Sequence, residues 1–241
     1  MCNSFHSHLR PGICCILPPH MLEALRMRGD KKIREMAEKL EKESLLYRAS
    51  RQDAMPPTAF LAAPRVSGVR PLPKREVYDG KKKADLPGVL VRSEGQAPCA
   101  DAAADEAYDG AGDVYNLYLD QFQRDSLDGM GMTLIQTVHH RRNYNNAFWD
   151  GEQMAYGDGD GQIFTKFTEI SVIGHELSHG VVQFSGGLTY RDQSGALNES
   201  FADVFGSMAK QFRLNQTAGE ADWLVGAGIF GPGIKGESLR S

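Results

Sequence analysis

Cysteine is scarce in this chain: four of its 241 residues are cysteines, and none of them forms a C-x-x-C pair. Cys14 and Cys15 are neighbours, a spacing that suits neither an ordinary disulfide nor a zinc knuckle. The sequence therefore gives no reason to expect a fold that is held together by disulfide bonds.

Long apolar runs are missing as well. The longest run near the N-terminus covers residues 13–17 and stops at Pro18, so it is too short for a membrane span or for the core of an ordinary signal peptide. A strong charge of either sign is also absent, because the net charge is −4. We therefore expect neither a nucleic-acid partner nor a membrane partner.

Charge and composition divide the chain into parts. Residues 1–60 carry 10 basic and 7 acidic side chains, whereas the remainder carries 17 and 24. A basic leader could dock on an acidic body, although a solvated charged helix explains the pattern equally well. Proline, alanine and serine are frequent at residues 50–74, which is typical of an extended linker. We expect a leader at 1–55, a linker at 56–74 and a domain at 75–241.

Local patterns predict an α+β fold for this domain. A helical leader is predicted at residues 20–48, with a break at Gly29 and Asp30. Further along the chain, strand patterns and a turn alternate with longer helical patterns. The predicted strands are 76–79, 88–91, 132–139 and 145–149, the turn is 156–161, and the helices are 103–123, 170–184 and 195–211.

The string HELSH occupies residues 175–179, inside one of the predicted helices. Residues four apart on a helix share a face, so His175 and His179 can bind one zinc ion. Glu176 lies beside them, where a carboxylate can take a proton from a water that the metal activates. Two ordinary histidines on a helix would give the same string, so the motif needs support from elsewhere.

That support comes twenty residues later. Glu199 and Asp203 are four apart on the next predicted helix, so both can face the same ion. Catalytic zinc requires a third protein ligand, and Glu199 would supply it. Asp203 would accept the outer N–H of a zinc-bound histidine and so fix its tautomer. The two helices together predict a catalytic zinc site with Glu176 as its general base.

These strings resemble the thermolysin family of neutral metalloproteases, and the resemblance covers roughly residues 74–241. It implies a zinc endopeptidase with a mixed sheet and zinc-binding helices. The metzincin family is excluded, because its third histidine would fall at Ser185. The matching strings are NNAFW at 145–149, YGDGDG at 156–161, HELSH at 175–179, GGLTY at 186–190 and GALNESFAD at 195–203.

The resemblance implies roles for further residues. Tyr190 would hydrogen-bond the oxyanion of the tetrahedral intermediate, although a core tyrosine is the ordinary alternative. Asn146 and Ala147 would receive the substrate backbone on an edge strand. Asn198 and Asp203 would contact the two histidines at the ring nitrogens that face away from the zinc. The implied cofactor is Zn²⁺, and the implied partner is a peptide or protein substrate.

Thermolysin also binds calcium at a double site built from carboxylates. Among the matching positions here only Asp222 is acidic, and Lys210 could pair with it. We therefore expect the double calcium site to be lost, while calcium elsewhere stays an option. The string at 156–161 lacks the later bidentate glutamate of an EF-hand, so we interpret it as a turn. The remaining positions that match the thermolysin calcium site are Ser171, Leu224 and Ala227, and none of them is acidic.

The leader resembles that of the protealysin-like subgroup, whose short prosegment carries a Pro-Pro motif followed by apolar residues. Pro18, Pro19, Met21 and Leu22 fit this description. The resemblance implies a prosegment that occupies the cleft as an intramolecular inhibitor until the linker is cut, and a leader thiol could plug the zinc site instead. Family members are commonly secreted, which we expect here, although the missing signal peptide leaves retention in the cytoplasm open.

The C-terminal end is expected to depart furthest from the family. No histidine follows His179, so we expect the helical second domain, with its catalytic histidine, to be absent. On that expectation the chain would be a fragment or an incomplete gene model. The rival interpretation is an inactive zinc-binding module that binds a protein partner through its edge strand. The intact Glu176 favours the enzyme, since a structural zinc site has no use for a base.

Overall fold

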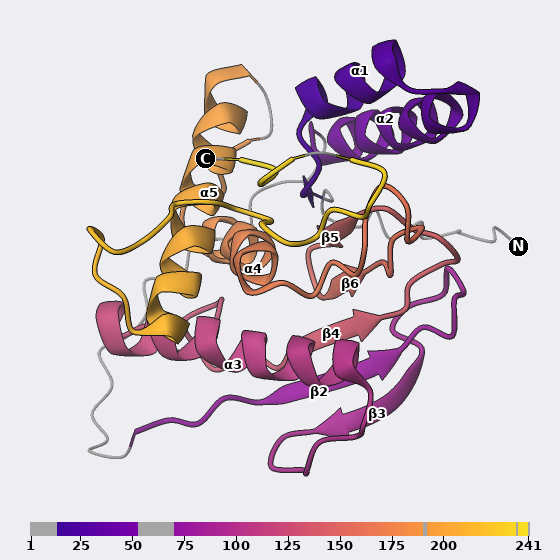
Figure 1. Ribbon diagram of the computed structural model, residues 1–241. Helices are drawn as coiled ribbons and strands as arrows, with labels where there is room; N and C mark the ends of the chain where they lie inside the picture. Colours follow the sequence, from indigo (N-terminus) through magenta and orange to yellow (C-terminus); the bar gives the residue numbers. More distant parts are fainter. Residues whose placement is uncertain (1–13, 53–69, 190–191, 235, 241) are drawn as a thin grey trace, which may run out of the picture.

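A mixed sheet of six strands forms the base of the domain in the computed structural model, which describes residues 14–52, 70–189, 192–234 and 236–240. The strand order is β1-β5-β6-β4-β2-β3 (Figure 1). Strands β2, β4 and β6 run parallel to one another, while β3, β5 and β1 pair antiparallel with their neighbours. The strands are β1 (Cys14–Cys15), β2 (Arg75–Asp79), β3 (Val89–Ser93), β4 (Leu134–Val138), β5 (Ala147–Trp149) and β6 (Met154–Tyr156).

Three long helices accompany the sheet: α3 (Ala102–Phe122) lies between β3 and β4 in the sequence, and α4 (Ile170–Ser185) and α5 (Asp192–Leu214) follow β6. Helix α4 packs against both α3 and α5. Side chains define where two of these helices begin, because Asp101 and Glu169 accept backbone N–H groups from the first turns of α3 and α4. A glycine lets α5 approach α4 closely, since a Cβ on Gly206 would lie 2.6 Å from the carbonyl oxygen of Ser171.

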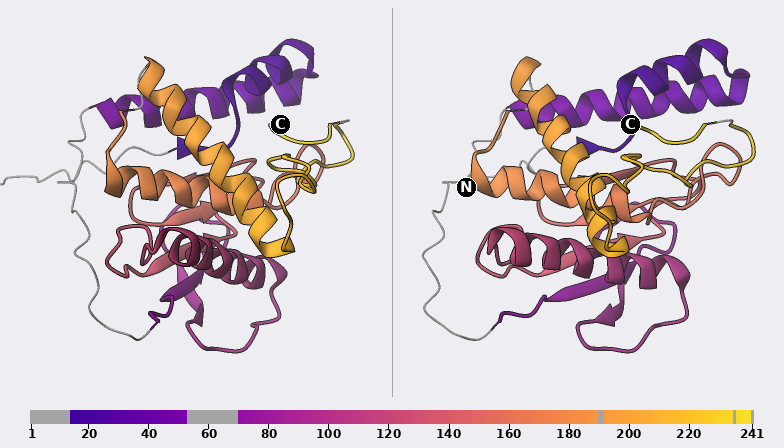
Figure 2. Two further views of the ribbon diagram at one scale, coloured as in Figure 1. Left: turned by 90° about the vertical axis from the view of Figure 1, so that its left-hand side faces the viewer. Right: turned by 60° about the vertical axis from the view of Figure 1, so that its left-hand side comes forward.

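The leader folds into a helical hairpin, α1 (Pro19–Arg28) and α2 (Lys31–Gln52). Figures 1 and 2 show the hairpin at the end of the molecule opposite α3, above β5 and beside α5. Ile16, Leu17 and Leu22 are buried and belong to the same hydrophobic cluster as Phe148 of β5. The leader and the catalytic fold therefore share one core.

The predicted fold class and most predicted elements are confirmed. The break at Gly29 and Asp30 separates α1 from α2, and every predicted helix or strand is present with shifted ends. Strands β1, with two residues, and β6, with three, were not predicted. Most of the predicted linker, residues 56–69, lies outside the described residues. Within the described ranges, no helix combines the length and the apolar character needed to cross a membrane.

Candidate metal centre

Helices α4 and α5 bring three metal-ligating side chains together. One donor atom from each of His175, His179 and Glu199 lies within 4.8 Å of the other two. The two Nε2 atoms are 3.0 Å apart, and Glu199 Oε2 lies 3.7 Å from His175 Nε2. Both imidazoles are buried. Two imidazoles and a carboxylate facing one point are a donor set that fits zinc.

The outer nitrogens of the two imidazoles also have partners. His179 Nδ1 is 2.8 Å from Asn198 Oδ1, and His175 Nδ1 is 2.8 Å from Asp203 Oδ1. Asn198 Oδ1 can accept the proton of His179 Nδ1, which directs the lone pair of Nε2 toward the ion. The Asp203 carboxylate lies behind His175, within ion-pair distance of its Nδ1. Burial lowers the pKa of His175, and the nearby Arg240 acts in the same direction. The neutral imidazole, which is the form that binds a metal, is therefore favoured.

Glu176 lies between the two histidines in the sequence and has a fully buried side chain. Its Oε2 accepts the backbone N–H of Trp149 in β5 at 3.1 Å. The carboxylate is therefore held against β5, which lies next to the edge strand β1. It can exchange a proton with a molecule bound there without leaving α4.

The strand predicted to receive a substrate is paired with the leader. In β1, Cys14 lies opposite Trp149 and Cys15 lies opposite Phe148, in antiparallel register. Just after β1, the N–H of Ile16 donates to the carbonyl of Ala147 at 3.3 Å. These backbone groups of β5 are the ones that an added peptide strand would use.

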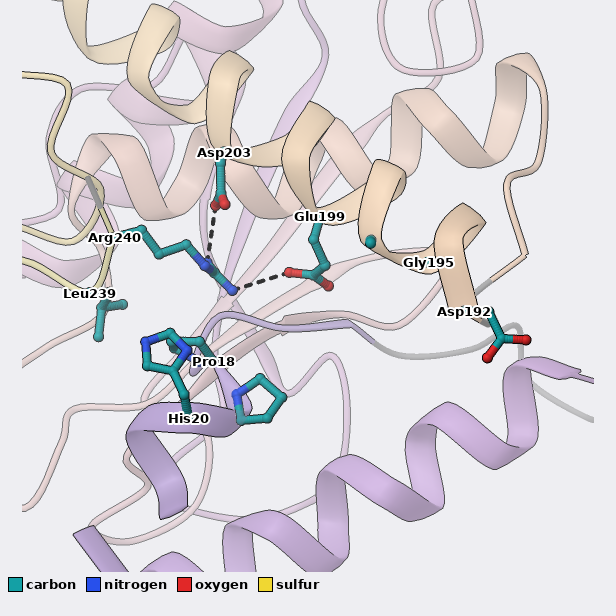
Figure 3. Close-up of a pocket in the computed structure, with 10 residues that line it drawn as sticks. Pro18, His20, Asp192, Gly195, Glu199, Asp203, Leu239 and Arg240 are labelled. Atoms are coloured by element: carbon teal, nitrogen blue, oxygen red, sulfur yellow. Dashed lines mark hydrogen bonds and ion pairs between the residues drawn. The ribbon is translucent and has the colours of Figure 1, made fainter. Parts of the chain in front are cut away.

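A cavity of about 670 Å³ opens between the leader and α5 (Figure 3). Pro18, Pro19 and His20 line one side of it. On the other side, Arg240 lies 3.1 Å from Glu199 Oε2 and 3.2 Å from Asp203 Oδ1. Sequence reasoning missed Arg240, because it is 41 residues from Glu199 and lies in no recognisable motif.

Two further predicted site residues are Asn146 and Tyr190. Asn146 is buried and its Oδ1 accepts the N–H of Ala147 at 3.0 Å. Tyr190 lies outside the described residues, so its role stays a prediction. Lys210, the residue expected to replace calcium, donates to both carboxylate oxygens of Asp222, at 2.8 and 2.6 Å.

Comparison with known sequences decides the family. The profile described as "Thermolysin metallopeptidase, catalytic domain" matches residues 70–183, and "Thermolysin metallopeptidase, alpha-helical domain" matches residues 186–241. The chain belongs to the thermolysin family. An extracellular metalloprotease of Pectobacterium carotovorum is 43% identical over 95% of the chain, and the protease PrtS of a Photorhabdus strain is 52% identical over 69% of it.

Among solved structures, the precursor of protealysin, a metalloproteinase from Serratia proteamaculans, is similar to this member of the thermolysin family. The identity is 43%, the TM-score is 0.76, and the match covers 95% of this chain and 65% of that one. The chain spans 64% of the Pectobacterium protein and 45% of PrtS.

The second profile corrects one expectation. We expected the helical domain of the thermolysin family to be absent, yet its profile matches residues 186–241. Helix α5, which carries Glu199, lies within that range. The expectation was wrong because α5 supplies a ligand to the same site as α4 and was therefore counted with the catalytic domain. The region at 75–241 thus contains residues of both domains.

Proposed function

We propose that this chain is the precursor of a zinc endopeptidase whose leader covers the active site. The observation that carries the proposal is the position of Glu176. It lies beside the donor set of His175, His179 and Glu199, and it contacts the strand on which the leader pairs. A zinc site with a structural role alone gains nothing from a buried carboxylate at that place.

Zinc held by His175, His179 and Glu199 would lower the pKa of water and polarise a carbonyl group. The residues of the chain would do the rest. Glu176 takes the proton of the attacking water on its carboxylate and delivers it to the leaving amine. The N–H of Trp149 keeps that carboxylate oriented, and β5 aligns the substrate backbone.

Three contacts support a leader that inhibits the enzyme. Strand β1 uses the backbone groups of β5 that a substrate would need. Pro18, Pro19 and His20 line the cavity that Glu199 also lines. Further along the leader, Glu43 of α2 pairs with Arg141 at 3.1 Å. We propose that a cut after α2 releases this blockade. We also propose that the enzyme acts outside the cell, as the name of its Pectobacterium relative states for that protein.

The test is the peptidase activity of the zinc-loaded chain, measured before and after the leader is cleaved at a protease site engineered into residues 53–69. We expect one bound zinc and activity that increases on cleavage. Glu176→Gln should lower kcat roughly a hundred- to ten-thousand-fold without loss of zinc. The matched control is Glu152→Gln, an exposed glutamate beyond β5, which should leave activity unchanged.

Two outcomes would contradict the proposal. Activity that survives in Glu176→Gln would remove the general base from the mechanism. One bound zinc without peptidase activity in the cleaved parent would favour the rival interpretation, a zinc-binding module that binds a protein partner.

A further inference from the structure

Helix α4 holds β5 at two points that both belong to one residue, Trp149. Glu176 accepts its backbone N–H at 3.1 Å, and Gln183, two turns further along α4, accepts its indole N–H at 2.9 Å. The amide nitrogen of Gln183 donates in turn to the carbonyl of Gly151 at 3.0 Å. Both ends of one amide side chain are thus used to fix the end of β5 and the turn after it.

The indole between these two points is tightly enclosed. Trp149 is 2% exposed, and a Cβ on Gly180 would lie 3.3 Å from its ring and 2.8 Å from Leu127. The glycine lets the ring lie close to α4 at a position between Glu176 and Gln183 in the sequence. Because the ring cannot shift independently, its position determines where the backbone N–H of Trp149 points.

We propose that Gln183 is a positioning residue: it sets the register of β5 on α4, and thereby the orientation of Glu176. The inference rests on the proposed function, in which Glu176 is the general base. Gln183 is half-buried and outside the donor set of the metal centre. It acts through its hydrogen bonds to Trp149 and Gly151. A shift of β5 by about 1 Å would misplace the carboxylate enough to cost roughly a hundredfold in rate.

Amide hydrogen exchange on the intact chain tests the contact between Gln183 and Trp149 without any catalysis. Gln183→Met keeps the length of the side chain and removes both of its hydrogen bonds. The chain has two tryptophans, and Trp223 is exposed and bonded to Ala218, so its signals serve as an internal control. We expect the indole and the backbone N–H of Trp149 to exchange roughly tenfold faster, with Trp223 unchanged. A backbone N–H that keeps its protection would overturn the proposal.

Kinetics on the zinc-loaded, cleaved enzyme tests the consequence. Gln183→Met should lower kcat by about tenfold to a hundredfold while KM changes by less than about threefold, the pattern of a lost orientation. Gln183→Glu keeps the acceptor for the indole and should recover part of the loss. The control is Gln211→Met on α5, a buried glutamine bonded to Ser207, which should leave kcat unchanged.

The outcomes separate this inference from the proposed function. An equal fall in kcat for Gln183→Met and Gln211→Met would indicate general destabilisation and overturn the positioning role. An unchanged kcat in Gln183→Met, where Glu176→Gln is inactive, would overturn it as well. A parent without activity would contradict the proposed function, while the exchange measurement would still decide whether Gln183 holds β5.

Discussion

Leu17 offers the sharpest test of how the leader is held. Its side chain is 1% exposed and lies between β1 and α1, inside the core that the leader shares with β5. Truncating a buried leucine to alanine costs about 2–5 kcal/mol in stability. If this core holds the leader on β5, Leu17→Ala lowers the free energy that is needed to detach the leader by about 3 kcal/mol. That is roughly a hundredfold increase in the open population.

The assay is amide exchange at Ile16, whose N–H donates to the carbonyl of Ala147 and becomes free when the leader opens. We expect exchange at Ile16 to accelerate roughly a hundredfold in Leu17→Ala. The amide of Val172, in the first turn of α4 and with a fully buried side chain, should keep its rate. Leu90→Ala is the matched control, because Leu90 lies on β3 at the far edge of the sheet and is 48% exposed.

Two results would refute this reasoning. An unchanged rate at Ile16 would show that Leu17 does not hold the leader. A parallel acceleration at Ile16 and Val172 would show that the substitution destabilises the whole domain instead. Under the proposed function, the uncleaved Leu17→Ala chain should also gain peptidase activity in proportion to its open population.

The remaining predictions concern the ion pairs of His139 and of Lys210. The pKa of His139 is raised to about 9, chiefly by its hydrogen bond to Asp158 and also by that to Asp101. A histidine whose pKa is raised on folding stabilises the fold below pH 6.5, and this contribution is lost as the pH rises to 9. The free energy of unfolding should therefore fall by up to about 3 kcal/mol between pH 6.5 and pH 9 in the parent and stay constant in His139→Gln. Denaturant titrations at both pH values would show this, and equal slopes in the two proteins would contradict it. Because Lys210 already pairs with Asp222, a calcium chelator that spares zinc should leave the melting temperature unchanged, whereas Lys210→Met should cost about 1 kcal/mol. A drop of several degrees with the chelator would indicate a bound calcium ion.

Local sequence predicted the helices and the two halves of the metal centre. A spacing of four residues puts His175 and His179 on one face of α4, and the same spacing puts Glu199 and Asp203 on one face of α5. Helical geometry alone fixes these pairs, so no tertiary information was needed. The structure then places donor atoms of His175, His179 and Glu199 around one point.

The parts that sequence reasoning missed all depend on contacts between distant segments. Strand β1 has only two residues and becomes a strand because β5, more than 130 residues away, offers it a partner. Arg240 carries no motif, and only the path of the chain after α5 brings it to Glu199. The helical domain was overlooked because a shared metal site hides the boundary between α4 and α5.

The sequence by itself determined which chemistry this chain can support, because the spacing of ligands along a helix is a local property. Only the tertiary structure decided which distant segments of the chain contact the site that supports this chemistry. The pairing of β1 with β5 and the clamp from Gln183 to Trp149 join residues tens of positions apart or more. Such contacts depend on how the elements pack, and packing is set by the whole core and not by any one segment.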